Sequence, residues 1–295
     1  MIVVGARCAG SPLATMLARR GLRVCLLDRA DFPSDSPSTH GIQPPGVKVL
    51  AELGVLDQLL EAAPAIEKGF LALDDHRIEQ GGMVELLGAP MVNARRVTLD
   101  AILVEAAVGA GAELRTKTAV TGLIRSGSRI VGVETPAGPL RAPLVVGADG
   151  ARSTIARLVG APEYHRTAPR RAFLWSYYEG VEVDQAQVWI GNIEDNGFLA
   201  SPTDGGLFLA AFVTPIERRD ELRADRSGAF EDGIRCWPEL GEAVSKGRRV
   251  APVQLGTASS ARPSGPAGPW SATPATSRTP PPARASPTPS TKWRP

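Results

Sequence analysis

The sequence is poor in cysteine, in net charge and in long apolar runs. Its three cysteines, Cys8, Cys25 and Cys236, are odd in number and lack the close spacing of a metal site, so we expect a reduced, cytoplasmic protein without a metal. No apolar run approaches the length of a membrane span, and the first apolar strand begins almost at Met1, so we expect neither a span nor a signal peptide. A formal net charge of +2 is too small to indicate a nucleic-acid or membrane-surface partner.

The C-terminal part also lacks most of the residues that build a core. Residues 258–295 contain no Leu, Ile, Val, Phe, Met, Asp or Glu. Such a composition cannot bury enough apolar surface to fold, so we expect residues 256–295 to form a disordered, low-complexity tail. The chain of 295 residues, 43 % hydrophobic and 22 % charged, is otherwise typical of one large or two modest globular domains.

The N-terminal stretch predicts two strands around a helix. Residues 2–4 and 24–27 are short apolar runs, and the apolar residues between them recur at helical spacing as far as Gly21. A strand, helix, strand order predicts a parallel sheet and therefore an α/β fold.

Downstream, the pattern alternates between helices and strands. A helix is expected around residues 46–60 and a longer one over 96–112, with Thr98 as its N-cap and Asp100 in its first turn. Turn residues within 112–146 predict a three-stranded meander. We expect further strands from residue 171 to 213, where about half of the aromatic residues lie, whereas 70–92 looks irregular.

The stretch "GARCAG" resembles the dinucleotide fingerprint G-x-G-x-x-G between a strand and a helix. Gly5 and Gly10 match, but Arg7 takes the middle position, where glycine lets the backbone approach a pyrophosphate. Asp28 ends the second strand, where an acid can bind two ribose hydroxyls. Taken alone, the turn is equally consistent with simple packing, and Asp28 with a capping role.

Two further stretches indicate anion or cofactor contacts. Arg95 and Arg96 precede a helix N-terminus, where the helix dipole disfavours cations, so an external anion would explain them. The alternative is two solvated loop arginines. Asp149 lies between two glycines at a strand-to-helix turn, which allows close backbone approach; the alternative is a tight turn capped by Ser153 or Thr154.

Five stretches in a fixed order together resemble a known family. They are "VVGARCAGSP" from Val3, "DR" at 28–29, "STHGIQPPG" at 38–46, "RRVTLD" at 95–100 and "GADGARSTIAR" at 147–157. The chain resembles the FAD-dependent monooxygenases and reductases of the p-hydroxybenzoate hydroxylase class, and within it the geranylgeranyl-reductase-like branch.

The resemblance implies a set of cofactor contacts. It places Gly5, Arg7, Ala9 and Gly10 at the FAD pyrophosphate, Asp28 and Arg29 at the adenosine ribose, Arg96, Asp149 and Gly150 elsewhere along FAD, and His40 and Gln43 near the isoalloxazine or the substrate. No catalytic residue is assigned, because the flavin carries the hard chemistry.

The resemblance also implies a Rossmann-type FAD-binding domain of residues 1–68 and 93–165, with the meander, and a sheet-rich substrate domain of 69–92 and 166–250. The implied activity is that of a monooxygenase using NAD(P)H on a small apolar or aromatic substrate. A reductase of isoprenoid double bonds is the alternative, and a non-catalytic FAD-binding remnant is the alternative of another class. The oligomeric state is open.

One motif of the resembled family, a late Gly-Asp, has no match in the sequence. All residues of the tail from Ala258 except Lys292 have codons with C or G in the middle, as expected when a GC-rich gene is translated out of frame. Shifted by one base, residues 269–280 permit Ala-Leu-Val-Gly-Asp, which contains the missing motif. We therefore expect the tail to be an out-of-frame translation.

Overall fold

The computed structural model describes residues 1–36, 41–257 and 260–263. The predicted flavin contact His40 lies outside these residues. The predicted tail from residue 264, which we expect to be translated out of frame, also lies outside them. Among the described helices, none combines the length and the apolar composition needed to cross a lipid bilayer.

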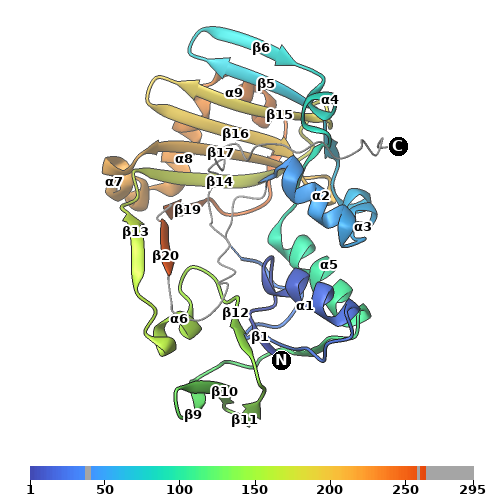
Figure 1. The fold of residues 1–295 in the computed structure, drawn as a ribbon. Coiled ribbons are helices and arrows are strands. Elements are labelled where there is room, and N and C mark those ends of the chain that lie inside the picture. The colour runs from blue at the N-terminus through green and yellow to red at the C-terminus, as the bar shows by residue number, and fades with distance from the viewer. Residues whose placement is uncertain (37–40, 258–259, 264–295) are drawn as a thin grey trace.

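A four-stranded parallel sheet forms the centre of the first part of the fold (Figure 1). Its order is β12 (Val145–Gly147), β1 (Ile2–Val4), β2 (Cys25–Leu27) and β8 (Glu113–Arg115), and all three pairings are parallel. Every residue of β1 is buried, as expected for an apolar strand covered on both faces. The predicted parallel sheet is therefore confirmed.

Two helices pack against each other beside this sheet, namely α1 (Gly10–Arg19) and α5 (Arg96–Gly109). Their apolar faces share a core with Val3 and Leu26 of the strands. The expected helix over 46–60 is two helices, α2 (Pro44–Glu52) and α3 (Leu56–Ala62). Gly54 lies between them with φ of +67°, a left-handed conformation that ends one helix and redirects the chain.

Smaller elements complete this part of the molecule. The predicted meander is confirmed as three antiparallel strands: β9 (Gly122–Ser126), β10 (Arg129–Thr135) and β11 (Gly138–Arg141). A second small sheet contains β3 (Gly41–Ile42), β7 (Met91–Asn93) and β4 (Ala65–Ile66), and α6 (Thr154–Val159) follows β12. We call all these elements the parallel-sheet part.

The second part is an eight-stranded sheet, which we call the large sheet. It contains β5 (Lys68–Leu73), β6 (His76–Gln80), β14 (Arg171–Glu179), β15 (Gln187–Ile193), β16 (Asn196–Pro202), β17 (Phe208–Pro215), β18 (Arg248–Arg249) and β19 (Gln254–Thr257). The expectation of an irregular 70–92 is wrong. That segment holds most of the β5–β6 hairpin and the helix α4 (Met83–Leu87), and the pairing of β5 with the distant β15 was not visible in the local pattern.

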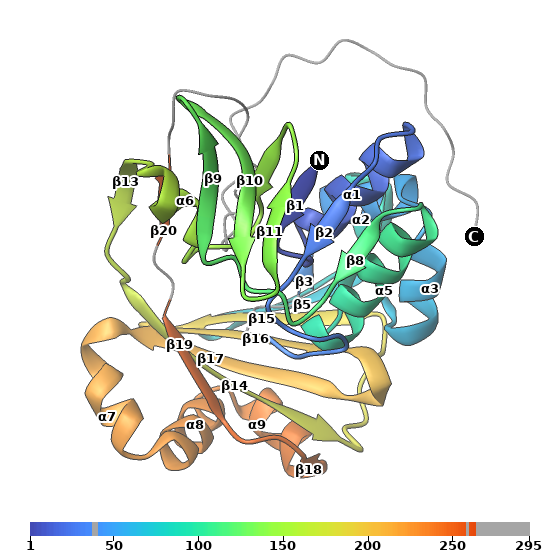
Figure 2. The ribbon, with the colours of Figure 1, turned by 90° about the horizontal axis from the view of Figure 1, so that it is seen from below.

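The two faces of the large sheet meet different neighbours. Helices α7 (Arg219–Ala224), α8 (Arg226–Arg235) and α9 (Pro238–Ser245) cover one face, and the parallel-sheet part lies on the other (Figure 2). Phe198, Phe212 and Trp237 are buried on the helix side. Along β14, Trp175 and Tyr177 alternate with Leu174 and Tyr178 of this core and belong to a separate apolar cluster, on the face toward the parallel-sheet part.

The predicted tail begins too early. Residues 256–257 belong to β19, which pairs with β14, and β20 (Ser260–Pro263) pairs with β13 (Glu163–Thr167). These residues find backbone partners in strands far earlier in the chain, so their low-complexity composition alone did not determine their conformation.

Candidate functional site

The turn between β1 and α1 requires both of its glycines. Gly5 has φ of +102°, and a Cβ atom there would lie 2.4 Å from the carbonyl oxygen of Ala148. A Cβ atom at Gly10 would lie 1.7 Å from the carbonyl oxygen of Gly5. The helix therefore starts directly against the sheet, and its N-terminus carries the positive end of the helix dipole, which suits an anion. The Ser11 amide already donates to the carbonyl oxygen of Arg7 over 3.0 Å, and Pro12 has no N–H group.

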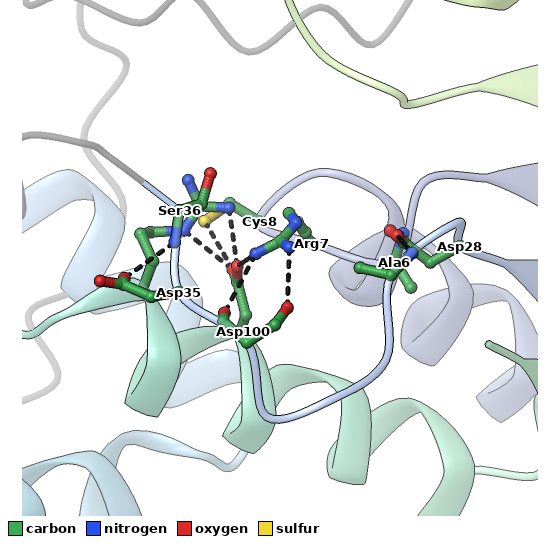
Figure 3. A network of polar contacts seen from close by, with 10 residues as sticks. Ala6, Arg7, Cys8, Asp28, Asp35, Ser36 and Asp100 are labelled. Atoms are coloured by element: carbon green, nitrogen blue, oxygen red, sulfur yellow. Dashed lines mark hydrogen bonds and ion pairs between the residues drawn. The ribbon is translucent and has the colours of Figure 1, made fainter. Parts of the chain in front are cut away.

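Arg7, at the middle fingerprint position, is held by its own chain. Its Nη1 donates to Asp100 Oδ2 over 2.6 Å and its Nη2 to Ser34 Oγ over 2.9 Å. The guanidinium carbon lies 5.3 Å from the centre of the Phe32 ring. Figure 3 shows Arg7 and Asp100 pointing toward each other beside the turn. The positive charge that replaces the middle glycine is thus fixed by a bond to α5.

Asp100 is the centre of this charge cluster, and its side chain is fully buried. Besides Arg7, it accepts hydrogen bonds from Arg96 Nε at 2.9 Å and from the Cys8 thiol at 3.4 Å. Burial and the charge of Asp100 raise the pKa of Cys8 to about 12, so the thiol stays protonated. Two guanidinium groups thus share one carboxylate in this cluster.

The start of α5 differs from the expected capping. The N-cap is Arg95 and not Thr98, and it makes no side-chain cap hydrogen bond. Asp100 lies beyond the first turn and acts as an ion-pair partner of Arg96 four residues earlier. The spacing of Arg96 and Asp100 is the helical i, i+4 pattern, which could have indicated this pair from the sequence.

Asp28 links the second strand to the glycine turn. Its Oδ2 accepts a hydrogen bond from the Ala6 amide and its Oδ1 from the Ala30 amide, both at 2.8 Å. Figure 3 shows Asp28 directed at Ala6. Each carboxylate oxygen has a second lone pair for a further donor. Neither amide belongs to a helix and Asp28 is buried, so Asp28 is not the helix cap of the alternative interpretation. The ribose contact stays a prediction.

Asp149, like Asp28, is a predicted cofactor contact that already makes hydrogen bonds within the chain. It accepts hydrogen bonds from the amides of Thr154 at 2.6 Å and Ile155 at 3.2 Å, and from the Ser153 hydroxyl. Ser153 is the N-cap of α6, as the structural alternative predicted. Gly150 is exposed with φ of +85°. The contacts of Asp149 and Gly150 with FAD stay predictions.

Of the other predicted contacts, Ala9 lies in the turn beside Gly10, and Arg29 and Gln43 are exposed. Gln43 is the N-cap of α2. Their roles also stay predictions.

The partner of Arg95 is a carboxylate of the chain itself and not the external anion that we expected. Asp204, in the 3-10 turn η1 (Asp204–Gly206) between β16 and β17, accepts hydrogen bonds from Arg95 Nε at 3.0 Å, from Arg95 Nη2 at 2.8 Å and from the Arg95 amide at 2.7 Å. Thr98 Oγ1 donates to the same carboxylate over 2.6 Å. Burial alone would raise the pKa of Asp204, but the hydrogen bonds from Arg95 and Thr98 outweigh it and lower that pKa. Arg95 is therefore not a solvated loop arginine.

The site fits a bound dinucleotide in two respects. It brings two arginine side chains, Arg7 and Arg96, next to the N-terminus of α1, a combination that suits a pyrophosphate. In addition, Ser11 Oγ in the first turn of α1 is buried and has no hydrogen-bond partner among the described residues. Buried polar atoms are normally satisfied by protein, water or a ligand. The described part of the chain contains no cluster of His, Cys, Asp or Glu suited to a metal ion.

Sequence reasoning missed Ser34, Asp100 as an ion-pair centre, and Asp204. Ser34 and Asp204 carry no signal in their local sequence, because each matters only through a partner far away in the chain. Asn93 and Ser11 flank recognised motifs, and only their burial distinguishes them.

Comparison with known proteins supports the same interpretation. A family model described as an FAD binding domain matches residues 1–236. Rifampicin monooxygenase of Streptomyces venezuelae is 30 % identical over 162 residues, which make up 54 % of this chain and 33 % of that protein. Digeranylgeranylglycerophospholipid reductase 1 of Methanococcoides burtonii is 27 % identical over 200 residues, 64 % of this chain and 47 % of that protein. The chain thus spans between a third and a half of these two relatives.

A solved structure gives the same picture of the fold. The myxobacterial chondrochloren halogenase, a variant of FAD-dependent halogenases, superposes with a TM-score of 0.77 at 22 % identity. The superposition covers 89 % of this chain and 64 % of the halogenase. At this level of identity the likeness shows that the two chains share a fold.

Proposed function

Because this chain belongs to the family of FAD binding domains, we propose that it is the FAD- and substrate-binding part of a flavin-dependent oxidoreductase. We propose further that the reaction is a monooxygenation that uses NAD(P)H as electron donor. Rifampicin monooxygenase, similar over 54 % of this chain, supports the reaction class. When bound, FAD would supply the redox chemistry, and the protein would bind, orient and shield it.

The proposed cofactor contacts follow from the charges and the turn. The Gly10 amide and the positive end of the α1 dipole would bind the pyrophosphate, and Arg7 and Arg96 would balance its charge. Asp28 would bind the adenosine ribose through its free lone pairs. Arg29, Gln43, Asp149 and Gly150 complete the proposed set, as does His40 outside the described residues.

The observation that carries the proposal is the apolar face turned toward the parallel-sheet part. Trp175 and Tyr177 lie on it with Leu209, in a cluster separate from the helix-covered core. The apolar and aromatic side chains of this segment favour a small apolar or aromatic substrate. We propose that residues 1–68 and 93–165 bind the cofactor and that 69–92 and 166–250 bind the substrate. The three cysteines are unpaired in the structure, which is consistent with a reducing, cytoplasmic location.

The test starts from the full chain purified with added FAD. We expect a flavin absorption spectrum that is retained on gel filtration, and NADH or NADPH oxidation that rises with apolar aromatic compounds. Incorporation of labelled oxygen from dioxygen into the product would support monooxygenation. Saturation of an isoprenoid double bond without oxygen incorporation would favour the reductase, and bound FAD without any turnover would favour a binding remnant.

A further inference from the structure

Two contacts of different kinds join the parallel-sheet part to the large sheet. The first is apolar: Ile66 of β4 and Met91 of β7 pack against Val188 of β15. The second is the contact of Arg95 and Thr98 with Asp204. Apolar contacts are not directional, whereas charged hydrogen bonds from two guanidinium nitrogens to one carboxylate oxygen fix an orientation.

The second contact is unusually complete. The Asp204 side chain is 3 % exposed, and each of its oxygens has protein donors. Oδ2 accepts from Arg95 Nε, Arg95 Nη2 and Thr98 Oγ1, and Oδ1 accepts from the Arg95 amide and from Thr203 Oγ1 at 3.0 Å. The carboxylate therefore both pairs with the arginine and satisfies an amide at the start of α5.

The backbone of the turn is shaped for this approach. Gly205 and Gly206 have φ of +71° and +67°, which favours glycine. A Cβ atom on Gly205 would lie 3.3 Å from Arg95 Nη2. The other face of the arginine covers the Tyr177 ring, with the guanidinium carbon 5.8 Å from the ring centre. Arg95 is thus held between the turn and the apolar face of the large sheet.

We propose that Arg95 and Asp204 are positioning residues that set the apolar face of the large sheet at a fixed distance and angle over the cofactor. The proposal rests on the proposed function, because it assigns the pair a task in closing the FAD and substrate site. Arg95 directly precedes Arg96, the first residue of α5. One short backbone segment therefore connects the contact with the large sheet to the charge cluster at Asp100. A shift of the turn would therefore change how well the sheet shields the flavin.

The test compares Asp204→Asn and Arg95→Met with a matched control, Asp232→Asn. Asp232 also pairs with an arginine, Arg235 at 2.6 Å, but the pair is exposed on α8 and belongs to neither measured segment. The first measurement is quenching of bound-FAD fluorescence by iodide, alongside FAD affinity. The second is hydrogen–deuterium exchange in the absence of FAD, followed at 91–93 and 187–189, which Asp204 does not touch. If Asp204→Asn does not fold, Arg95→Met and the milder Thr98→Val take its place.

We expect iodide quenching to rise severalfold in both interface variants with FAD affinity nearly unchanged, and exchange at 91–93 and 187–189 to rise as well. The control should match the wild type. Unchanged quenching, with faster exchange only at 95–98 and 203–207, would mean that Asp204 is merely a helix cap and would overturn the proposal. A wild type that binds no FAD would contradict the proposed function, and the exchange at 91–93 and 187–189 would then decide the positioning role alone.

Discussion

Arg7 and Asp100 join the glycine turn to α5, with Arg7 Nη1 donating to Asp100 Oδ2 over 2.6 Å between residues 93 positions apart. Arginine at a position where the fingerprint has glycine is therefore part of an ion-pair cluster. Asp100 is fully buried and shared with Arg96, so removal of either arginine leaves a buried carboxylate with fewer donors.

Restoring the fingerprint glycine should harm this protein. We expect Arg7→Gly to lower the free energy of unfolding by about 1–3 kcal/mol, the cost of leaving a buried charged group short of a partner, and to weaken FAD binding. Urea unfolding and fluorescence titration with FAD measure the two effects. The control is Arg23→Gly, at an exposed loop arginine outside the proposed cofactor contacts. Tighter FAD binding at unchanged stability would show that Arg7 only obstructs the turn.

Asp28→Ala should weaken FAD binding by about 1–3 kcal/mol, the range of one charge-assisted contact. The same change removes the acceptors of the Ala6 and Ala30 amides, so unfolding must be measured on the apoprotein as well. Asp31→Ala is the control, since Asp31 is on the same loop but pairs with the exposed Lys117. If FAD affinity does not change in the titration, the ribose assignment is wrong.

Arg96→Ala should weaken FAD binding more than Arg95→Ala. Arg96 belongs to the positively charged cluster with Arg7, whereas the charge of Arg95 is matched by Asp204. Isothermal titration of the two apoproteins with FAD measures the difference. The reverse order would mean that the roles of the two arginines have been exchanged.

The contact at Asp204 should make the free energy of unfolding depend on pH in the acid range. Hydrogen bonds from Arg95 and Thr98 overcome the effect of burial and lower the pKa of Asp204 below its ordinary value of 3.8. A carboxyl group with a lowered pKa stabilises the fold above the pKa of the unfolded chain, and this contribution is lost as the pH falls through the folded value. The stability difference between wild type and Asp204→Asn should therefore be constant from pH 7 to about pH 5 and shrink below about pH 4. A difference that stays constant down to the acid transition would contradict this.

Cys8 should resist alkylation in the folded protein. Burial and the nearby Asp100 raise its pKa to about 12, and the thiolate is the reactive form. Cys236 is exposed and should react first with iodoacetamide at pH 8, as followed by mass spectrometry of peptides. Equal alkylation rates for the two thiols in the native state would contradict the prediction, because they would show that the Cys8 thiol beside Asp100 is accessible to the reagent.

The local elements of the first part were predictable because their signals are short in range. The apolar runs of β1 and β2, the turn with Gly5 and Gly10, and the meander all follow from periodicity and turn residues within each stretch. The α/β class and the FAD-binding family are confirmed. The expected single helix over 46–60 and the N-cap at Thr98 were wrong, because Gly54 and an acceptor from the large sheet determine those boundaries.

By itself, the sequence determined where strands, helices and glycine turns can form, since backbone sterics and apolar periodicity act over a few residues. Only the tertiary structure decided which charges meet. Arg95 and Asp204 lie 109 positions apart, and the two residues become neighbours through the pairing of β16 with β17 and the packing of the large sheet against β4 and β7. Burial then makes each such pair specific, because a carboxylate removed from water requires a donor within hydrogen-bond distance.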